Sequence, residues 1–333
     1  MAAVVRTEDI RHLSVAVLRI LAVTVAYYVT GQIGLIREVV LEGAVVTPLW
    51  PSTGVALTCL LWFGAGVWPG ITLGALLSVA TVGPLYLGDL GILAGNTLAP
   101  LCSLWLLRRV GFRPDLARLR DGLALVFLGA LAGMLISSTL GTSMMVVSGR
   151  LRPEGFWPVW AAWWTGDAMG VLVVTPLLLV LRRARLPRDL HRWGEAGTLA
   201  VLSVAITLLA TRSSVALLFL VFPLIIWAAL RFEFAGSAPS VLLVSVLAIV
   251  AATDRVGPFA HHTLFEVMFS LQALNGCAAL TGLLLAAVVT EQKNIRRKVE
   301  EACEELASVV DQLAPEVSVN RWPPERGRRQ AEG

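Results

Sequence analysis

The sequence predicts an all-α protein: a polytopic transmembrane helical bundle of eight to ten spans, followed by a short cytoplasmic coiled-coil helix. Hydrophobic residues make up 56% of the 333 positions and charged residues only 15%. Soluble globular domains carry about 25% charged residues. Many of the apolar runs approach the ~20 residues that a helix needs to cross a bilayer. These observations predict an integral membrane protein.

The first apolar run, 14–36, is longer than the core of a typical signal peptide, and no small-residue cleavage site follows it. We therefore interpret it as a retained first span. The runs 53–66 and 68–83 are only ~20–24 Å long as helices. They form either two short spans or one tilted or re-entrant hairpin, which gives the range of eight to ten spans. The remaining runs lie at 88–107, 121–147, 157–181, 195–211, 214–230, 236–253 and 264–290.

Clusters of basic residues predict the orientation of the bundle. They follow three of the runs, at 108–120, 182–192 and 293–298. In either layout the three clusters fall on one face, which the positive-inside rule makes cytoplasmic. Both termini then lie in the cytoplasm. The net charge of +4 is explained by these basic loops, so we expect no nucleic-acid partner.

Four Gly-x-x-x-Gly pairs, each in a different run, predict that the helices pack closely. Such pairs let helix backbones approach one another in lipid, where no hydrophobic force drives helices together. The pairs are Gly70/Gly74, Gly91/Gly95, Gly129/Gly133 and Gly166/Gly170.

After Thr290 the composition changes to a charged segment with a heptad pattern. Its apolar residues are spaced 4, 3, 4, 3, 4, as in the seam of a coiled coil. Two tails pair in parallel, making the protein a homodimer, or the helix lies on its own bundle or on lipid; we favour pairing. The predicted domains are 1–13 (cytoplasmic segment), 14–290 (membrane domain), 291–314 (signalling helix) and 315–333 (disordered tail). The seam consists of Ile295, Val299, Ala302, Leu306, Val309 and Leu313.

Asp167 is the leading candidate for a functional residue, because an ionisable group in a membrane-length helix requires a protein-lined or watered pocket. Asp167 and Asn96 both fall near the middle of the bilayer core, ~22 Å and ~18 Å from the basic edge. They are therefore placed to share a hydrogen bond or a small polar ligand. Trp163 and Trp164 lie four and three residues before Asp167, so we expect both to flank it.

Two roles for this group remain open from the sequence. Aromatic walls with one acid suit a small amphipathic or cationic ligand. A protonated aspartate bonded to Asn96 or to a backbone carbonyl would instead only fix the packing. The ligand-binding candidates are Asp167, Asn96, Trp163 and Trp164.

Other features predict less. In the segment Trp50-Pro-Ser-Thr-Gly54 we expect a helix start with a serine or threonine cap and a rigid proline. Asp89 lies at the start of its run, where we expect it to be accessible to water. The cysteines show no spacing typical of disulfides or metal sites, and we expect no cofactor, no metal and no catalytic residues. The cysteines are Cys59, Cys102, Cys277 and Cys303.

Five short signatures occur in order along the bundle. They are Leu49-Trp-Pro-Ser-Thr-Gly54, Trp68-Pro-Gly70 with Gly74-Ala, Gly95-Asn-Thr97, Trp163-Trp-Thr-Gly-Asp-Ala-Met-Gly170 leading to Thr175-Pro176, and Phe222-Pro with Trp227-Ala-Ala-Leu-Arg-Phe232. Together they resemble the bacterial membrane-associated sensor domain of the first MASE class, over roughly residues 14–290. The resemblance implies a sensor in the bacterial inner (plasma) membrane, usually fused to a histidine kinase, a cyclic-dinucleotide enzyme or another output.

This chain departs from that architecture because its tail has no histidine and no output signature. We therefore expect a sensory input module that transmits an unknown signal through its last span and coiled coil. Its partners would be a ligand or membrane protein and a cytoplasmic kinase or cyclic-dinucleotide enzyme in trans, unless the chain is a truncated product. The alternative is a small-solute transporter or a transporter-associated receptor, since short, Gly/Pro-interrupted spans and a midplane acid suit one. No arrangement of nucleophile and base indicates an enzyme.

Overall fold

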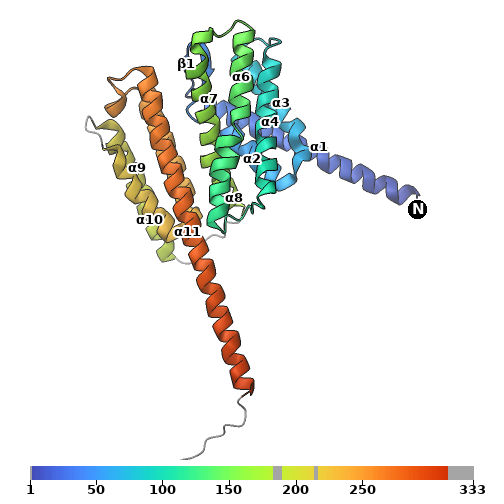
Figure 1. The fold of residues 1–333 in the computed structure, drawn as a ribbon, viewed down its shortest axis with the longest axis vertical. Helices are drawn as coiled ribbons and strands as arrows, with labels where there is room; N and C mark the ends of the chain where they lie inside the picture. Colours follow the sequence, from blue (N-terminus) through green and yellow to red (C-terminus); the bar gives the residue numbers. More distant parts are fainter. Residues whose placement is uncertain (1, 183–189, 214–216, 314–333) are drawn as a thin grey trace, which may run out of the picture. The chain divides into compact units, whose positions relative to one another are not determined.

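The computed structural model describes residues 2–182, 190–213 and 217–313 (Figure 1). Most of these residues are helical, which confirms the predicted all-α class. The described strands form one antiparallel hairpin, β1 (Val39–Leu41) and β2 (Ala44–Val46). The helices are α1 (Ala2–Leu35), α2 (Pro51–Phe63), α3 (Trp68–Val82), α4 (Asp89–Arg109), α5 (Leu119–Ala124), α6 (Leu135–Val147), α7 (Phe156–Met169), α8 (Thr175–Leu181), α9 (Leu190–Arg212), α10 (Val221–Thr253) and α11 (Leu264–Leu313).

Contacts divide the chain into two units, 1–291 and 292–333. The described part of the second unit, 292–313, is the C-terminal part of α11, which is helical without interruption. The tail that the sequence predicts to be disordered, 315–333, lies outside the described residues.

Eight described helical stretches are long and apolar enough to cross a membrane, which confirms a polytopic bundle. They are Leu13–Leu35, Ala65–Val82, Asp89–Arg109, Leu119–Val147, Pro153–Leu181, Trp193–Arg212, Leu218–Thr253 and Glu266–Val310. The run 68–83 is thus long enough for a span of its own, whereas the run 53–66 forms the 13-residue α2, which is shorter than the rest.

The stretch Leu218–Thr253 contains two antiparallel helical segments. Glu233 interrupts α10 with φ 55° and ψ −138°. Ile225 and Val241, sixteen residues apart, would lie ~24 Å apart along a straight helix. Both instead contact the same glycine of α11, because a Cβ at Gly282 would lie 3.3 Å from Ile225 Cγ2 and 2.7 Å from Val241 Cγ2. The chain therefore turns back at Glu233, between the two runs that the sequence separates.

The short helix α2 is enclosed by the rest of the bundle. Every residue from Ser52 to Leu60 is buried, and α2 contacts α1, α4, α7 and α8. A helix that is apolar around its whole circumference belongs in a core rather than at a lipid or water boundary. Because its neighbours cover it, α2 does not need the length of a lipid-exposed span.

Small residues allow the close approach between α2 and the π-helical segment 170–174 that follows α7. A Cβ at Gly54 would overlap the carbonyl oxygen of Gly170, and a Cβ at Gly170 would overlap the carbonyl oxygen of Trp50. One of the predicted Gly-x-x-x-Gly pairs, Gly70 and Gly74, meets α1 in the same way. There a Cβ would lie 3.0 Å from Val23 Cβ and 2.7 Å from Tyr27 Cβ, respectively. This pair therefore marks a helix contact, as the sequence predicts.

The start of α2 differs from the expected serine or threonine cap. Trp50 occupies the N-cap position, and its side chain makes no capping hydrogen bond. The hydroxyl groups that follow point away from the helix end. Ser52 Oγ donates to the carbonyl oxygen of Tyr27 at 2.7 Å, and Thr53 Oγ1 donates to Asp167 Oδ1 at 2.7 Å. The capping prediction was wrong because these side chains bind neighbouring helices.

Two π-helical segments lie inside the spans of the first unit and contact each other. Residues 125–132 connect α5 to α6, and residues 170–174 connect α7 to α8. Wide π turns leave backbone carbonyl groups that need other donors. Trp164 Nε1 donates to the carbonyl oxygen of Leu131 at 2.8 Å, and Ser103 Oγ donates to that of Gly129 at 2.8 Å. Side chains of α7 and α4 thus stabilise the first π segment.

We predict that Gly54→Ala lowers stability by roughly 1–3 kcal/mol, the usual cost of overpacking a core. The added methyl group meets a backbone carbonyl group, which cannot rotate away. Thermal unfolding of the detergent-purified chain measures the effect. Gly197→Ala is the matched control, because Gly197 is exposed in α9 and a Cβ there has no neighbour within 4 Å. Equal unfolding temperatures for the two variants would show that Gly54 does not pack tightly against the backbone of Gly170.

Candidate functional site

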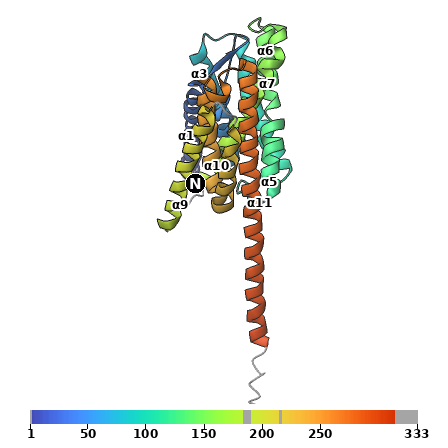
Figure 2. The same cartoon turned by 90° about the vertical axis from the view of Figure 1, so that its left-hand side faces the viewer.

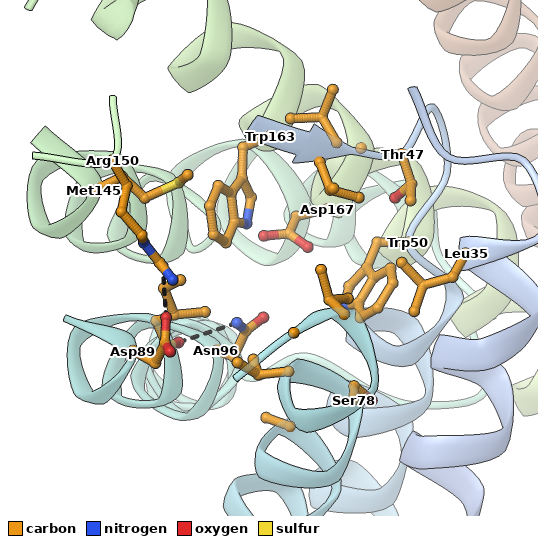
Figure 3. Close-up of a pocket in the computed structure, with 18 of the residues that line it drawn as sticks. Leu35, Thr47, Trp50, Ser78, Asp89, Asn96, Met145, Arg150, Trp163 and Asp167 are labelled. Atoms are coloured by element: carbon orange, nitrogen blue, oxygen red, sulfur yellow. Dashed lines mark hydrogen bonds and ion pairs between the residues drawn. The ribbon is translucent and has the colours of Figure 1, made fainter. Parts of the chain in front are cut away.

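A cavity of about 270 Å³ lies between α1, α3, α4, α7 and the β-hairpin. The hairpin turn, Glu42-Gly43, has positive φ at both residues (52° and 82°), which suits a two-residue hairpin loop. This turn directs Val45 and Val46 to the cavity wall. Most of the wall is apolar. Its polar and aromatic members include Tyr27, Trp50, Ser78, Tyr86, Asp89, Asn96, Arg150, Trp163 and Asp167 (Figure 3).

Asp167 lies on α7 and is 1% exposed. Its carboxyl group accepts hydrogen bonds from Thr53 Oγ1 of α2, at 2.7 Å, and from Ser137 Oγ of α6. Figure 3 shows the Trp163 ring beside this carboxyl group. Among the described residues, no Arg, Lys or His forms a salt bridge with Asp167. The cavity therefore contains a buried carboxyl group with hydroxyl donors and without a cationic partner.

Asn96 lines the same cavity as Asp167, but its hydrogen bonds go to other groups. Tyr27, which is 1% exposed, donates its hydroxyl proton to Asn96 Oδ1 at 3.2 Å. Asn96 Nδ2 donates to the carbonyl oxygen of Ile92 at 3.0 Å. Trp50 Nε1 donates to the Tyr27 hydroxyl group at 3.4 Å. Asn96 thus belongs to a chain of polar groups that positions one wall of the cavity.

The two predicted tryptophans lie in different places. Trp163 lines the cavity next to Asp167 (Figure 3). Trp164 does not: its ring stacks on that of Trp160 at 5.7 Å, and its indole N–H binds Leu131. Adjacent residues of an α-helix are rotated by about 100° from each other. Two consecutive side chains therefore did not both reach the face of Asp167.

An ion pair that the sequence reasoning missed lies at another part of the cavity. Arg150 Nη2 contacts Asp89 Oδ1 at 2.5 Å, and the backbone N–H of Tyr86 donates to Asp89 Oδ2 at 2.8 Å. The Arg150 guanidinium also lies over the Tyr86 ring, 5.4 Å from its centroid. Asp89 is 2% exposed, so the expected access to water was wrong.

The sequence contained a feature from which this ion pair could have been predicted. Asp89 begins one predicted span and Arg150 follows the end of the next, so both fall on the same membrane face. Gly149, with φ 74°, follows α6 and directly precedes Arg150. Helix order alone could not show that α4 and α6 are neighbours (Figure 1). Their packing brings the two charges together, and α6 lies beside α7 on its other side (Figure 2).

A model of one protein family, MASE1, matches residues 19–293. This match covers most of the chain, including every residue that lines the cavity. The family consists of membrane sensory input domains, which are not catalytic. No curated protein and no solved structure matches the chain.

We predict that Asp89→Ala lowers stability by roughly 1.5–3 kcal/mol, because it leaves the Arg150 guanidinium without its charged acceptor. Asp254→Ala is the matched control. Asp254 also binds an arginine, Arg37, at 2.6 Å, but both side chains of that pair are substantially exposed (39% and 49%). Such surface pairs contribute about 0.2–1 kcal/mol. If chemical unfolding of the two variants gives equal losses, the Asp89 pair is not a buried interaction.

Proposed function

The chain belongs to the MASE1 family of membrane sensory input domains, and on this premise we propose that it binds a small ligand in the cavity beside Asp167. In this proposal the protein lies in a bacterial inner membrane with both termini in the cytoplasm, and the cavity is on the outer side. The ligand changes the position of α11, whose cytoplasmic part acts on an output partner. The stimulus is a small amphipathic organic molecule with a cationic group.

The observation that carries the proposal is the buried Asp167 carboxyl group, which lines a cavity and has no cationic partner in the described part of the chain. Ionised groups in a membrane interior are costly and occur at functional sites or in charge pairs. Asp89, on the same cavity, has its pair in Arg150. A ligand cation next to Trp50 and Trp163 would supply the partner of Asp167, with additional attraction from the aromatic rings.

Hydrogen bonds support a route from Asp167 to Glu291 of α11. Ser137, which binds Asp167, belongs to α6, and α6 is joined to α5 through the first π-helical segment. At the other end of this helical run, the N–H of Leu119 donates to Glu291 Oε2 at 3.0 Å. A shift of α6 at the cavity would therefore reach Glu291 of α11, and π-helical segments frequently occur at functional sites.

A second contact at the same end of α11 involves the reversal of α10. Thr290 Oγ1 donates to Glu233 Oε2 at 3.1 Å, and Glu233 is the residue with positive φ at the turn. Thr290 and Glu291, which are neighbours in α11, thus form hydrogen bonds with α10 and with α5, respectively. We propose that ligand binding redistributes these two contacts, since a ligand acts through its different affinity for two arrangements.

The tail offers a surface for a second copy of the chain. The heptad residues Ile295, Val299, Leu306 and Val309 are between 46% and 66% exposed. Exposed apolar residues at heptad spacing favour pairing of two helices. We propose a parallel homodimer through this seam, which would present the signal to a cytoplasmic kinase or cyclic-dinucleotide enzyme in trans.

The binding proposal predicts that Asp167→Asn weakens binding of choline and phenethylamine at least tenfold. The amide retains the shape of the carboxyl group, and the hydroxyl groups of Thr53 and Ser137 can rotate to suit it. Calorimetric titration of the purified full chain in lipid nanodiscs measures the affinities. Asp254→Asn, which removes a charge from a residue outside the cavity lining, should bind as the wild type does. If neither cation binds the wild type, or Asp167→Asn binds both normally, the proposal fails.

The same purified chain, reconstituted into sealed liposomes, tests the transporter alternative. A 13-residue α2 followed by a break at Gly64 (φ 84°) is the interrupted span that favours it. Protein-dependent accumulation of labelled choline or phenethylamine would support transport and contradict a sensor that only binds.

The dimer proposal predicts that Ala302→Cys, in a chain otherwise freed of cysteines, forms an intermolecular disulfide in oxidised membranes. Ala302 belongs to the seam, so the two copies would place this position face to face. Glu304→Cys is the control, because residue 304 lies on the opposite side of the helix. Equal cross-linking of both variants, or none at Ala302→Cys, would contradict a parallel pair.

A further inference from the structure

We infer that the ligand of this cavity is a small zwitterion, with its cationic centre at Asp167 and a carboxylate at Arg150. This inference rests on the proposed ligand-binding function and specifies the second charge of the ligand. Figure 3 shows Arg150 and Asp89 at one side of the cavity and Asp167, with Trp163, further along it. The two sides differ in which of their charged groups are already satisfied.

At the Arg150 side, both carboxylate oxygens of Asp89 accept hydrogen bonds, but Arg150 has more donors than acceptors. Asp89 Oδ1 binds Arg150, and Asp89 Oδ2 accepts from the backbone of Tyr86. Arg150 carries five N–H donors, and the described structure gives its side chain one acceptor residue, Asp89. Its Nε atom is buried and has no hydrogen-bond partner among the described residues. A buried donor without an acceptor costs free energy, so the hydrogen bonding of Arg150 is incomplete. The Nη donors that Asp89 does not use remain for an incoming carboxylate.

At the Asp167 side the situation is reversed. The carboxyl group is buried and accepts hydrogen bonds from Thr53 and Ser137, and among the described residues it has no salt-bridge partner. A ligand ammonium group would therefore prefer Asp167 to Asp89, whose charge is compensated by Arg150. The charges of the cavity thus fix the direction in which a zwitterion binds.

Size and wall chemistry limit the rest of the ligand. A volume of about 270 Å³ is just below the range of typical ligand pockets, about 300–1,000 Å³. The apolar wall, including Val46, Val79, Ile92 and Met145, suits an aliphatic or aromatic substituent. Amino acids and betaines with one apolar substituent combine these properties.

Two matched sets of probes test the inference by calorimetry on the full chain in nanodiscs. In each set one compound is a zwitterion, one keeps only the cation and one keeps only the carboxylate. The first set is trimethylglycine, choline and 3,3-dimethylbutyrate. The second set is phenylalanine, phenethylamine and 3-phenylpropionate. We expect the zwitterion of at least one set to bind roughly tenfold or more tightly than its cation, as a charged hydrogen bond provides.

Substitutions at the two ends give separate readouts. Arg150→Gln should abolish the preference for the zwitterion over the cation while the cation still binds, and Asp167→Asn should weaken both. Arg150→Lys keeps a positive charge for Asp89 but lacks the Nε donor, so it should reduce the preference even if Arg150→Gln proves unstable. Arg152→Gln, at an exposed residue outside the cavity lining, should change nothing.

The outcomes separate the two proposals. If cations bind in an Asp167-dependent way and zwitterions bind no better, the zwitterion inference is wrong and the ligand-binding function stands. Tighter binding of the carboxylates than of the zwitterions would overturn the assigned direction. If none of the six compounds binds, both proposals fail.

Discussion

The close approach of α2 to α7 and to the π-helical segment 170–174 that follows it is the contact on which the candidate site depends. Glycines at 54 and 170 bring the two backbones together without side chains between them. This approach places the Thr53 hydroxyl group 2.7 Å from Asp167 and fixes Trp50 at the cavity edge. A further tie, the N–H of Trp50 to the carbonyl oxygen of Gly166 at 3.0 Å, joins the same segments. Without this packing, the carboxyl group would lose both its position and its shelter from lipid.

The two carboxyl groups of the cavity illustrate how surroundings separate residues of the same chemistry. Asp89 has an arginine and a backbone N–H, which use both of its oxygens. Asp167 has hydroxyl groups, which donate to it but bring no charge. A buried charge is stable when it is paired. The charge of Asp89 is therefore already paired within the protein, whereas Asp167 is the group whose charge we propose a ligand pairs.

One end of the first unit is organised around α11. Thr290 contacts the turn of α10 at Glu233, and Glu291 accepts from the first residue of α5. The α5–α6 run also contains Ser137, so one continuous helical run touches both the cavity and the end of the last span. The π-helical segment within this run is of a kind that occurs frequently at functional sites. This run is the one along which we propose that the signal crosses the bundle.

The sequence by itself determined the class of fold, most of the spans and the choice of Asp167 as the candidate site residue. These depend on hydropathy and on the cost of a charge in lipid. It also separated the two halves of α10, which are joined through the turn at Glu233. Asn96 and Trp163 could be placed near Asp167 by counting residues along helices, and both line its cavity. Trp164 could not be assigned in this way, because its face depends on which neighbour takes its indole group.

Only the tertiary structure decided which helices are neighbours. That choice buried Asp89 under Arg150, turned Ser52 and Thr53 away from capping, and enclosed α2 on all sides. Helices in lipid associate through close packing and polar contacts rather than through hydropathy. Hydropathy patterns therefore determine where the chain crosses the membrane, whereas the pairing of polar groups depends on shape complementarity between residues far apart in the chain.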